Sequence, residues 1–245
     1  MENFNEFDQP QVPEKNTGDI ISHAFNLFKG VFLYGTIIMV LYSIASFAVQ
    51  YLSGFDSNAF NEEIMAADGD FSQIDMQSFP GFTTYMLLSM LLAFLLAPMY
   101  VGFLYVVDKY NKNQRFSFSD LFYGFKHNLV NTIIYSFISS IIMGIAMIAC
   151  VIPVFFVAPL LLLGYPILTF ENASATTALS KSFNIAKENY GTFLGVAILA
   201  ILISMAGIVL CGIGVLLTAM FYIVAIYSLY VAFVGVPRNI VFSGR

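Results

Sequence analysis

Hydrophobic positions in this chain gather into long blocks that polar segments separate. Val31–Leu52 and Phe82–Val107 are the first two blocks, and each exceeds the roughly 20 apolar residues with which a helix crosses a bilayer. Leu129–Phe170 and Phe193–Val236 are long enough for two crossings each. They divide best near residues 150–153 and 211–214, because Pro153 in the first and two glycines in the second weaken a helix. The pattern therefore predicts six transmembrane helices.

Six spans predict an all-α fold, a polytopic membrane helix bundle. We place a disordered cytoplasmic tail at residues 1–18, a six-helix membrane domain at 19–236 and a cytoplasmic C-terminal tail at 237–245. An acidic extracytoplasmic loop at 53–81 interrupts the membrane domain. The first tail lacks the basic start and short apolar run of a signal peptide, so the first span is expected to be an uncleaved anchor.

Composition supports a membrane protein. Hydrophobic residues make up 59% of the 245 positions and charged residues only 10%, against about 25% charged residues in a soluble domain. A chain this apolar cannot cover its own surface in water, so a soluble globular protein is excluded. The sequence also lacks the basic surface with which proteins bind nucleic acid.

Charge is distributed unevenly across the six-span arrangement. All ten Lys and Arg residues fall on one side of the bilayer, and this side is expected to be cytoplasmic. Both termini are then cytoplasmic. The long loop on the other side lacks the spacing of a calcium loop and is expected to be solvated and disordered. Its acids are Asp56, Glu62, Glu63, Asp68, Asp70 and Asp75.

A pattern of the form Ser-x-x-Phe-x-x-[Phe/Ala]-Lys occurs three times, each time before an odd-numbered span. The three segments, which we call elbows, are Ser22–Lys29, Ser119–Lys126 and Ser180–Lys187. The second and third copies stay in register through the following spans, with Cys150 opposite Cys211. The sequence leaves open whether these two cysteines pair. It predicts a unit of one amphipathic elbow and one two-helix hairpin, used three times.

Each elbow is expected to lie at the cytoplasmic membrane interface. Its apolar side chains share one helix face, its first Ser is placed to cap the helix, and its last Lys is placed to reach lipid phosphate. One interpretation is an element that only orients the next span. The other is a specific site for anionic lipid, and its headgroup candidates are Lys29, Lys126, Lys187, Asn128 and Asn189.

The third elbow, Ala178–Asn189 (ALSKSFNIAKEN), runs into an apolar hairpin. It resembles uncharacterised bacterial six-helix inner-membrane families related to the membrane domain of glycerophosphodiester phosphodiesterases. The resemblance covers most of Asp19–Val236 and implies a multi-pass protein of the bacterial cytoplasmic membrane. Some members of these families are fused to a soluble phosphodiesterase. No such domain follows here, so that activity is not expected.

Small residues form two stripes inside the predicted spans. Such stripes let helices approach closely, and helix packing is their main interpretation. A path for a solute is the alternative. The helix-packing candidates are Ser136, Ser140 and Gly144 in the third span and Gly191 and Gly195 in the fifth.

Catalytic, metal and cofactor constellations are absent from the sequence. His23 and His127 lie in elbows without a carboxylate cluster, and we interpret both as solvated interfacial side chains. No charge lies inside a span, and Asp108 and Glu171 occupy span ends, where water is near. We therefore expect a non-enzymatic membrane module that binds lipid, a membrane protein partner or a second copy of itself. The alternative is a permease or channel for a small neutral or hydrophobic solute.

Overall fold

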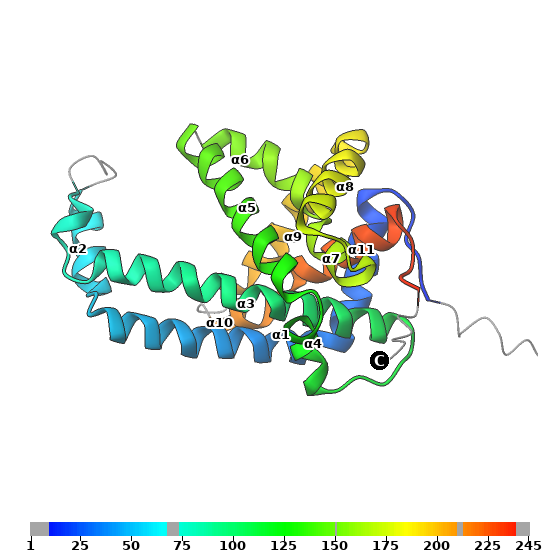
Figure 1. Cartoon of the computed structure of the whole chain (residues 1–245), viewed down its shortest axis with the longest axis horizontal. Coiled ribbons are helices and arrows are strands. Elements are labelled where there is room, and N and C mark those ends of the chain that lie inside the picture. Colours follow the sequence, from blue (N-terminus) through cyan, green and yellow to red (C-terminus); the bar gives the residue numbers. More distant parts are fainter. Residues whose placement is uncertain (1–9, 68–73, 150, 210–212, 239–245) are drawn as a thin grey trace, which may run out of the picture. The chain divides into compact units, whose positions relative to one another are not determined.

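The structure, a computed structural model, describes residues 10–67, 74–149, 151–209 and 213–238. Six helices in these ranges are long and apolar enough to cross a membrane, which confirms the all-α, six-helix fold class (Figure 1). They cover Thr17–Ser53, Phe82–Asn111, Leu129–Ala149, Pro153–Glu171, Tyr190–Ile208 and Gly214–Phe233. Cys150 and Cys211 lie outside the described residues, so the structure does not test whether they pair.

The first three spans are the continuous helices α1 (Thr17–Ser53), α3 (Phe82–Asn111) and α5 (Leu129–Ala149). The later spans are interrupted. The fourth comprises α6 (Val151–Val157), the 3-10 turn η4 (Ala158–Leu161) and α7 (Gly164–Glu171). The fifth comprises α9 (Tyr190–Met205) and η5 (Ala206–Val209). The sixth comprises α10 (Ile213–Thr218) and α11 (Phe221–Phe233).

The chain divides into two compact units, one of which is Val40–Leu96. This unit contains α2 (Ser57–Ala66) and η2 (Met76–Ser78) beside parts of α1 and α3. Its core is an aromatic cluster in which Phe55, 6% exposed, contacts Phe60, Phe82 and Tyr85 at ring-centroid distances of 5.5, 5.5 and 4.9 Å. Many of its other apolar side chains are exposed, as expected for helices that face lipid.

The larger unit comprises the rest of the chain, and α11 lies at its centre. Every side chain from Ile223 to Ala232 is buried, because this helix is apolar on all faces and other helices surround it. It packs against α9, while α7 packs against α8 (Ala175–Glu188) (Figure 1). The core of the larger unit therefore lies around the last span.

The three elbows do not share one structure. The second forms η3 (Phe118–Phe122) and α4 (Tyr123–Lys126), and the third lies in α8. Two positions after the last Lys of each stands an asparagine, Asn128 with a left-handed φ of 54° or Asn189 with φ of −123°, and a new helix follows. Val31 occupies the matching position after the first elbow, where α1 continues without a break. The first elbow is thus part of its span.

Capping by the first Ser of each elbow was expected and is wrong. Ser22 lies inside α1, Ser119 inside η3 and Ser180 in the middle of α8. The helices begin several residues earlier. Asn16 Oδ1 accepts a hydrogen bond from the Asp19 amide at 2.9 Å, and Ser174 Oγ accepts one from Thr177 at 3.2 Å.

The acidic segment also differs from the disordered loop predicted at 53–81. Asp56 caps α2 by accepting from the Asn58 and Ala59 amides, and Asp75 caps η2 through the Gln77 amide. Asp68 and Asp70 lie outside the described residues. In the tail predicted at 1–18, α1 already includes Thr17 and Gly18, and the Gln11 carbonyl accepts a hydrogen bond from Asn111 at 3.3 Å.

The fourth and sixth spans are interrupted at matching places in the predicted repeat. Ala158 begins η4, and Ala219, its counterpart in the third copy, lies between α10 and α11. Pro159 follows Ala158 and removes a helical amide donor, which accounts for the first interruption. This correspondence is consistent with the repeat, which stays a prediction.

The second elbow packs so closely on α3 that only glycine fits at two contacts. A Cβ on Gly102 would collide with the Leu121 backbone, and one on Gly124 would collide with the Pro98 carbonyl. Tyr105 and Tyr123 stack beside this contact with ring centroids 4.0 Å apart. Burial raises the pKa of Tyr123 to about 12, so this hydroxyl stays neutral at physiological pH.

We predict that Gly102→Ala lowers stability by about 1–3 kcal/mol, because the added methyl overpacks a backbone contact. Gly144→Ala is the matched control, since nothing lies within 4 Å of a Cβ there. It should be neutral or slightly stabilising, because Ala favours a helix. Thermal unfolding in detergent, followed by circular dichroism, measures both variants. Equal effects would contradict the close contact.

Candidate functional site

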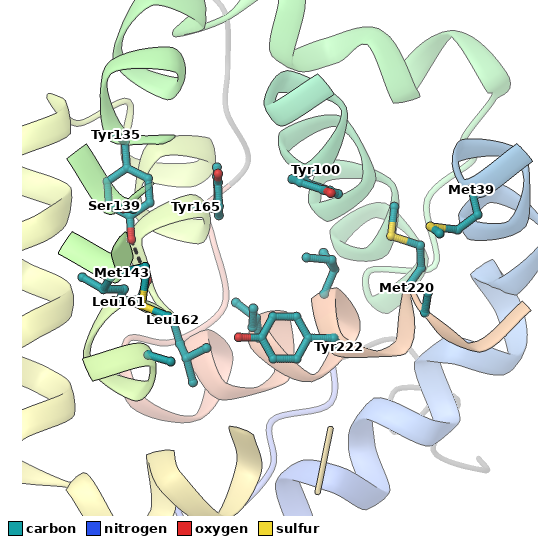
Figure 2. A pocket seen from close by; sticks show the side chains of 14 residues that line it. Met39, Tyr100, Tyr135, Ser139, Met143, Leu161, Leu162, Tyr165, Met220 and Tyr222 are labelled. Atoms are coloured by element: carbon teal, nitrogen blue, oxygen red, sulfur yellow. Dashed lines mark hydrogen bonds between the residues drawn. The ribbon is translucent and has the colours of Figure 1, made fainter. Parts of the chain in front are cut away.

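A cavity of about 410 Å³ lies among the helices of the larger unit. Met39 of α1 contributes to its wall, together with residues of α3, α5, η4 and α7 and of the α10–α11 junction. Figure 2 shows the rings of Tyr135, Tyr165 and Tyr222 around it. Both helix interruptions contribute to the wall, through Ala158 and Ala219. The broken spans therefore open the space that the cavity occupies.

The wall is apolar although it contains four tyrosines. The Tyr135 hydroxyl donates to the Leu161 carbonyl at 2.6 Å, and the Tyr165 hydroxyl shares a hydrogen bond with Ser136 Oγ at 2.7 Å. These two hydroxyls are used within the protein, so the rings of Tyr135 and Tyr165 contribute mainly apolar surface. Ser139 Oγ, which also lines the cavity, has no hydrogen-bond partner among the described residues.

Charge is absent from the lining among the described residues, whose other members are Met, Ala, Leu and Ile. An ion or a strongly polar solute would lose its hydration in such a space without replacement. An apolar molecule would lose nothing, and the volume lies within the range of about 300–1,000 Å³ that small-molecule pockets occupy. The cavity is thus suited to an apolar ligand.

A buried polar cluster joins α3 to α11 elsewhere in the same unit. Asp108 is 4% exposed and pairs with Lys112 at 2.7 Å. Its other oxygen accepts a hydrogen bond from the Tyr227 hydroxyl at 2.9 Å. Asn111 donates to the same hydroxyl at 3.1 Å. The expectation that Asp108 lies near water at a span end is therefore wrong, because α11 and Lys112 cover it.

His23 is also buried. It is 5% exposed, and its Nδ1 lies 2.9 Å from Ser228 Oγ, which itself donates to the Val224 carbonyl at 3.1 Å. The interpretation of His23 as a solvated side chain is wrong, since α11 packs over it. His127 differs, because it is partly exposed and stacks on Tyr123 at 4.3 Å. No group of three His, Cys, Asp or Glu side chains that would hold a metal occurs in the described ranges.

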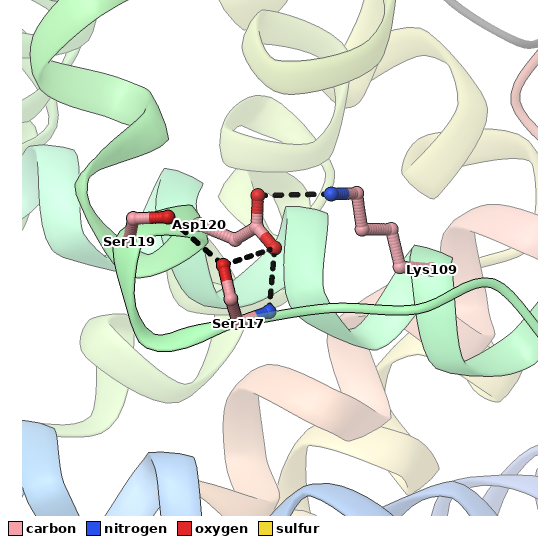
Figure 3. A network of polar contacts seen from close by, with 4 residues as sticks. All are labelled: Lys109, Ser117, Ser119 and Asp120. Carbon is pink, nitrogen blue, oxygen red and sulfur yellow. Dashed lines mark hydrogen bonds and ion pairs between the residues drawn. The ribbon is translucent and has the colours of Figure 1, made fainter.

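A smaller network attaches the second elbow to the end of α3. Lys109 pairs with Asp120 at 2.9 Å and lies over the Tyr105 ring at 4.7 Å from the centroid. Asp120 also accepts a hydrogen bond from the Ser117 amide at 2.7 Å (Figure 3). Lys109 is thus used within the protein and does not serve as a free surface charge.

The five headgroup candidates fall into two classes. Asn128 donates to the Leu168 and Ala173 carbonyls at 3.2 and 2.8 Å, and Asn189 donates to the Ile185 carbonyl at 3.0 Å. Both amides therefore hold helix ends. The lysines Lys29, Lys126 and Lys187 are exposed, and no ion pair involves them among the described residues. Only these three remain as candidates for lipid phosphate.

The five packing candidates are also divided. Ser136 is buried against Tyr165, and Gly195 faces the side chain of Thr17. A Cβ on Gly144 or Gly191 would meet nothing within 4 Å. Ser140 is exposed and bonds only to the Ser136 carbonyl, at 2.8 Å. Neither stripe as a whole packs against another helix of this chain.

The cavity residues were missed from the sequence. Tyr135, Tyr165 and Tyr222 come from three spans, and no spacing along the chain relates them. The one available signal was the pair Ala158 and Ala219, which the repeat sets opposite each other and which lie at both interruptions.

Comparison of the chain with protein-family models found no match, and no significant match was found among curated proteins or solved structures.

We predict that Asp108→Asn lowers stability by about 3–5 kcal/mol, because the change leaves the buried Lys112 charge without a partner. Lys112 and Asp108 side chains are 8% and 6% exposed. Glu171→Gln is the matched control, since the Glu171–Lys181 pair is 28% and 38% exposed and an exposed pair contributes at most about 1 kcal/mol.

Circular dichroism melting of the purified variants measures the difference. Adding Lys112→Met to Asp108→Asn should restore part of the loss, because it removes the unpaired charge. A double variant no more stable than Asp108→Asn alone would show that the ion pair is not the cause.

Proposed function

We propose that this protein is a non-enzymatic integral membrane module that holds an apolar molecule of the bilayer, a lipid chain, between its helices. The observation that carries the proposal is the cavity of about 410 Å³, lined by apolar and tyrosine side chains of the larger unit. In a bilayer the most abundant apolar molecules are lipid chains, so they are the natural occupants.

A permease for a small solute is the alternative function. A path for a polar solute needs polar groups along its wall. The lining offers few: Ser139 and four tyrosine hydroxyls, of which those of Tyr135 and Tyr165 are hydrogen-bonded within the protein. The lining therefore favours binding over transport of a polar solute. The alternative that is left is a carrier for a hydrophobic solute, which would use the same cavity.

Two adjacent residues provide a direct test. Ser139 lines the cavity, whereas Ser140 is exposed. We predict that Ser139→Phe fills the cavity and weakens binding of a pyrene-labelled fatty acid about tenfold, which corresponds to about 1.4 kcal/mol. Ser140→Phe, the same substitution one position later, should leave binding unchanged. Fluorescence titration in detergent measures the affinity.

Equal binding by both variants and the unsubstituted protein would contradict a lipid chain in this cavity. Facilitated uptake of a hydrophobic solute into vesicles, abolished by Ser139→Phe alone, would favour the carrier.

We also propose that the protein lies in the bacterial cytoplasmic membrane with both termini in the cytoplasm. We further propose that it is related to the six-helix families that resemble the membrane domain of glycerophosphodiester phosphodiesterases. The one-sided distribution of Lys and Arg supports the orientation. It directs the exposed Lys29, Lys126 and Lys187 toward anionic lipid of the cytoplasmic leaflet. The three-copy repeat is part of the same proposal.

We predict that alkaline phosphatase, active only outside the cytoplasm, is active when inserted within residues 53–81. It should be inactive when fused after Arg245. Activity at the C-terminal fusion would overturn the orientation, while loss of both activities together with loss of the protein on immunoblots would show misfolding.

A further inference from the structure

A second apolar space, a groove of about 420 Å³, lies between α8 and the fourth span. Ile142, Leu160, Leu179 and Phe183 form much of its wall. Leu161 lines both this groove and the inner cavity, so both spaces border η4. Ser182, fully buried, holds this wall in place by donating to the Leu160 carbonyl at 2.8 Å and accepting from the Leu163 amide at 3.1 Å.

The groove continues into a polar surface on the same helix. Thr176 and Ser180 belong to both, and the polar surface adds Thr177, Lys181 and Asn184. Ser180 and Asn184 lie one helical turn apart, and their side chains make no hydrogen bond to the described part of the chain. An apolar groove that meets hydroxyl, amide and ammonium groups at one end matches a molecule with one polar and one apolar end.

An ion pair at the polar surface selects the polar end: Lys181 lines this surface, and Glu171 adjoins it through its pair with Lys181. Lys181 Nζ lies 2.7 Å from both carboxylate oxygens of Glu171, and Tyr230 donates to that carboxylate at 3.2 Å. A lysine ammonium has three donors, so one remains for a phosphate oxygen. A carboxylate has about four acceptor positions, so one remains for an incoming N–H donor. The pair is neutral overall and offers one free N–H donor on Lys181 and one free acceptor position on Glu171.

We propose that this groove and polar surface bind one phospholipid with a phosphoethanolamine headgroup. One acyl chain lies in the groove, the phosphate accepts from Lys181 with Ser180 and Asn184 beside it, and the ammonium donates to Glu171. A choline headgroup lacks the N–H donor, and a glycerol headgroup lacks the positive charge. The site is separate from the occupant of the inner cavity.

The test uses the full chain in nanodiscs of phosphatidylethanolamine, phosphatidylglycerol and phosphatidylcholine with identical acyl chains in equal amounts. Native mass spectrometry after release into detergent counts the lipids that stay bound. We expect one retained phosphatidylethanolamine, favoured about tenfold over each of the other two.

Two variants address the site. Ser180→Phe blocks the junction of groove and polar surface, and Lys181→Gln removes the phosphate donor. Both should abolish the preference. Lys187→Gln is the control on the same helix, because Lys187 is exposed and lines neither space. Ser139→Phe, which tests the inner cavity, should leave this retained lipid in place, so the two proposals fail separately.

Equal retention of all three lipids means only bulk lipid around the helices and overturns the proposal. Preference for phosphatidylglycerol that Lys187→Gln removes assigns retention to exposed lysines and also overturns it. A dimer that Ser180→Phe dissociates makes the groove an interface between copies instead. If Lys181→Gln fails to fold by circular dichroism, Ser180→Phe and Asn184→Ala decide the outcome.

Discussion

The buried ion pair between Asp108 and Lys112 anchors a polar cluster that ties α3 to α11, the helix at the centre of the larger unit. Both side chains are less than 10% exposed, and each would leave an unpaired buried charge if the other were displaced. Asp108 also accepts from Tyr227, whose hydroxyl accepts from Asn111, which in turn donates to Gln11. Together these hydrogen bonds link α3 to α11 and to the chain before α1.

The interruptions in the fourth and sixth spans depend on a separate set of hydrogen bonds. A backbone break inside a membrane leaves polar groups unpaired unless other groups satisfy them. The Leu161 carbonyl accepts from Tyr135, the Leu160 carbonyl from Ser182, and Thr218 donates to the Ser204 carbonyl at 2.6 Å. The breaks are therefore tolerated, and they displace the helices enough to leave the cavity between them.

The sequence predicted the six spans because their signal is local: each needs only a block of apolar residues. Burial of His23 and Asp108 was not predictable in that way, since it depends on Tyr227 and Ser228, more than 100 positions away. The elbows illustrate the same limit. Their shared pattern was visible, but it did not show which elbows separate from their spans. The two that separate have Asn128 or Asn189 two positions after the last Lys, where the first elbow has Val31.

The cavity itself argues for an occupant. The side chains around this partly open space of about 410 Å³ lose dispersion contacts wherever nothing fills it. Water fits this space poorly, because it needs two to four polar partners and the lining offers few: Ser139 and four tyrosine hydroxyls, two of which are already hydrogen-bonded within the protein. A lipid chain restores the lost dispersion contacts without polar partners, and the surrounding bilayer supplies it at high concentration.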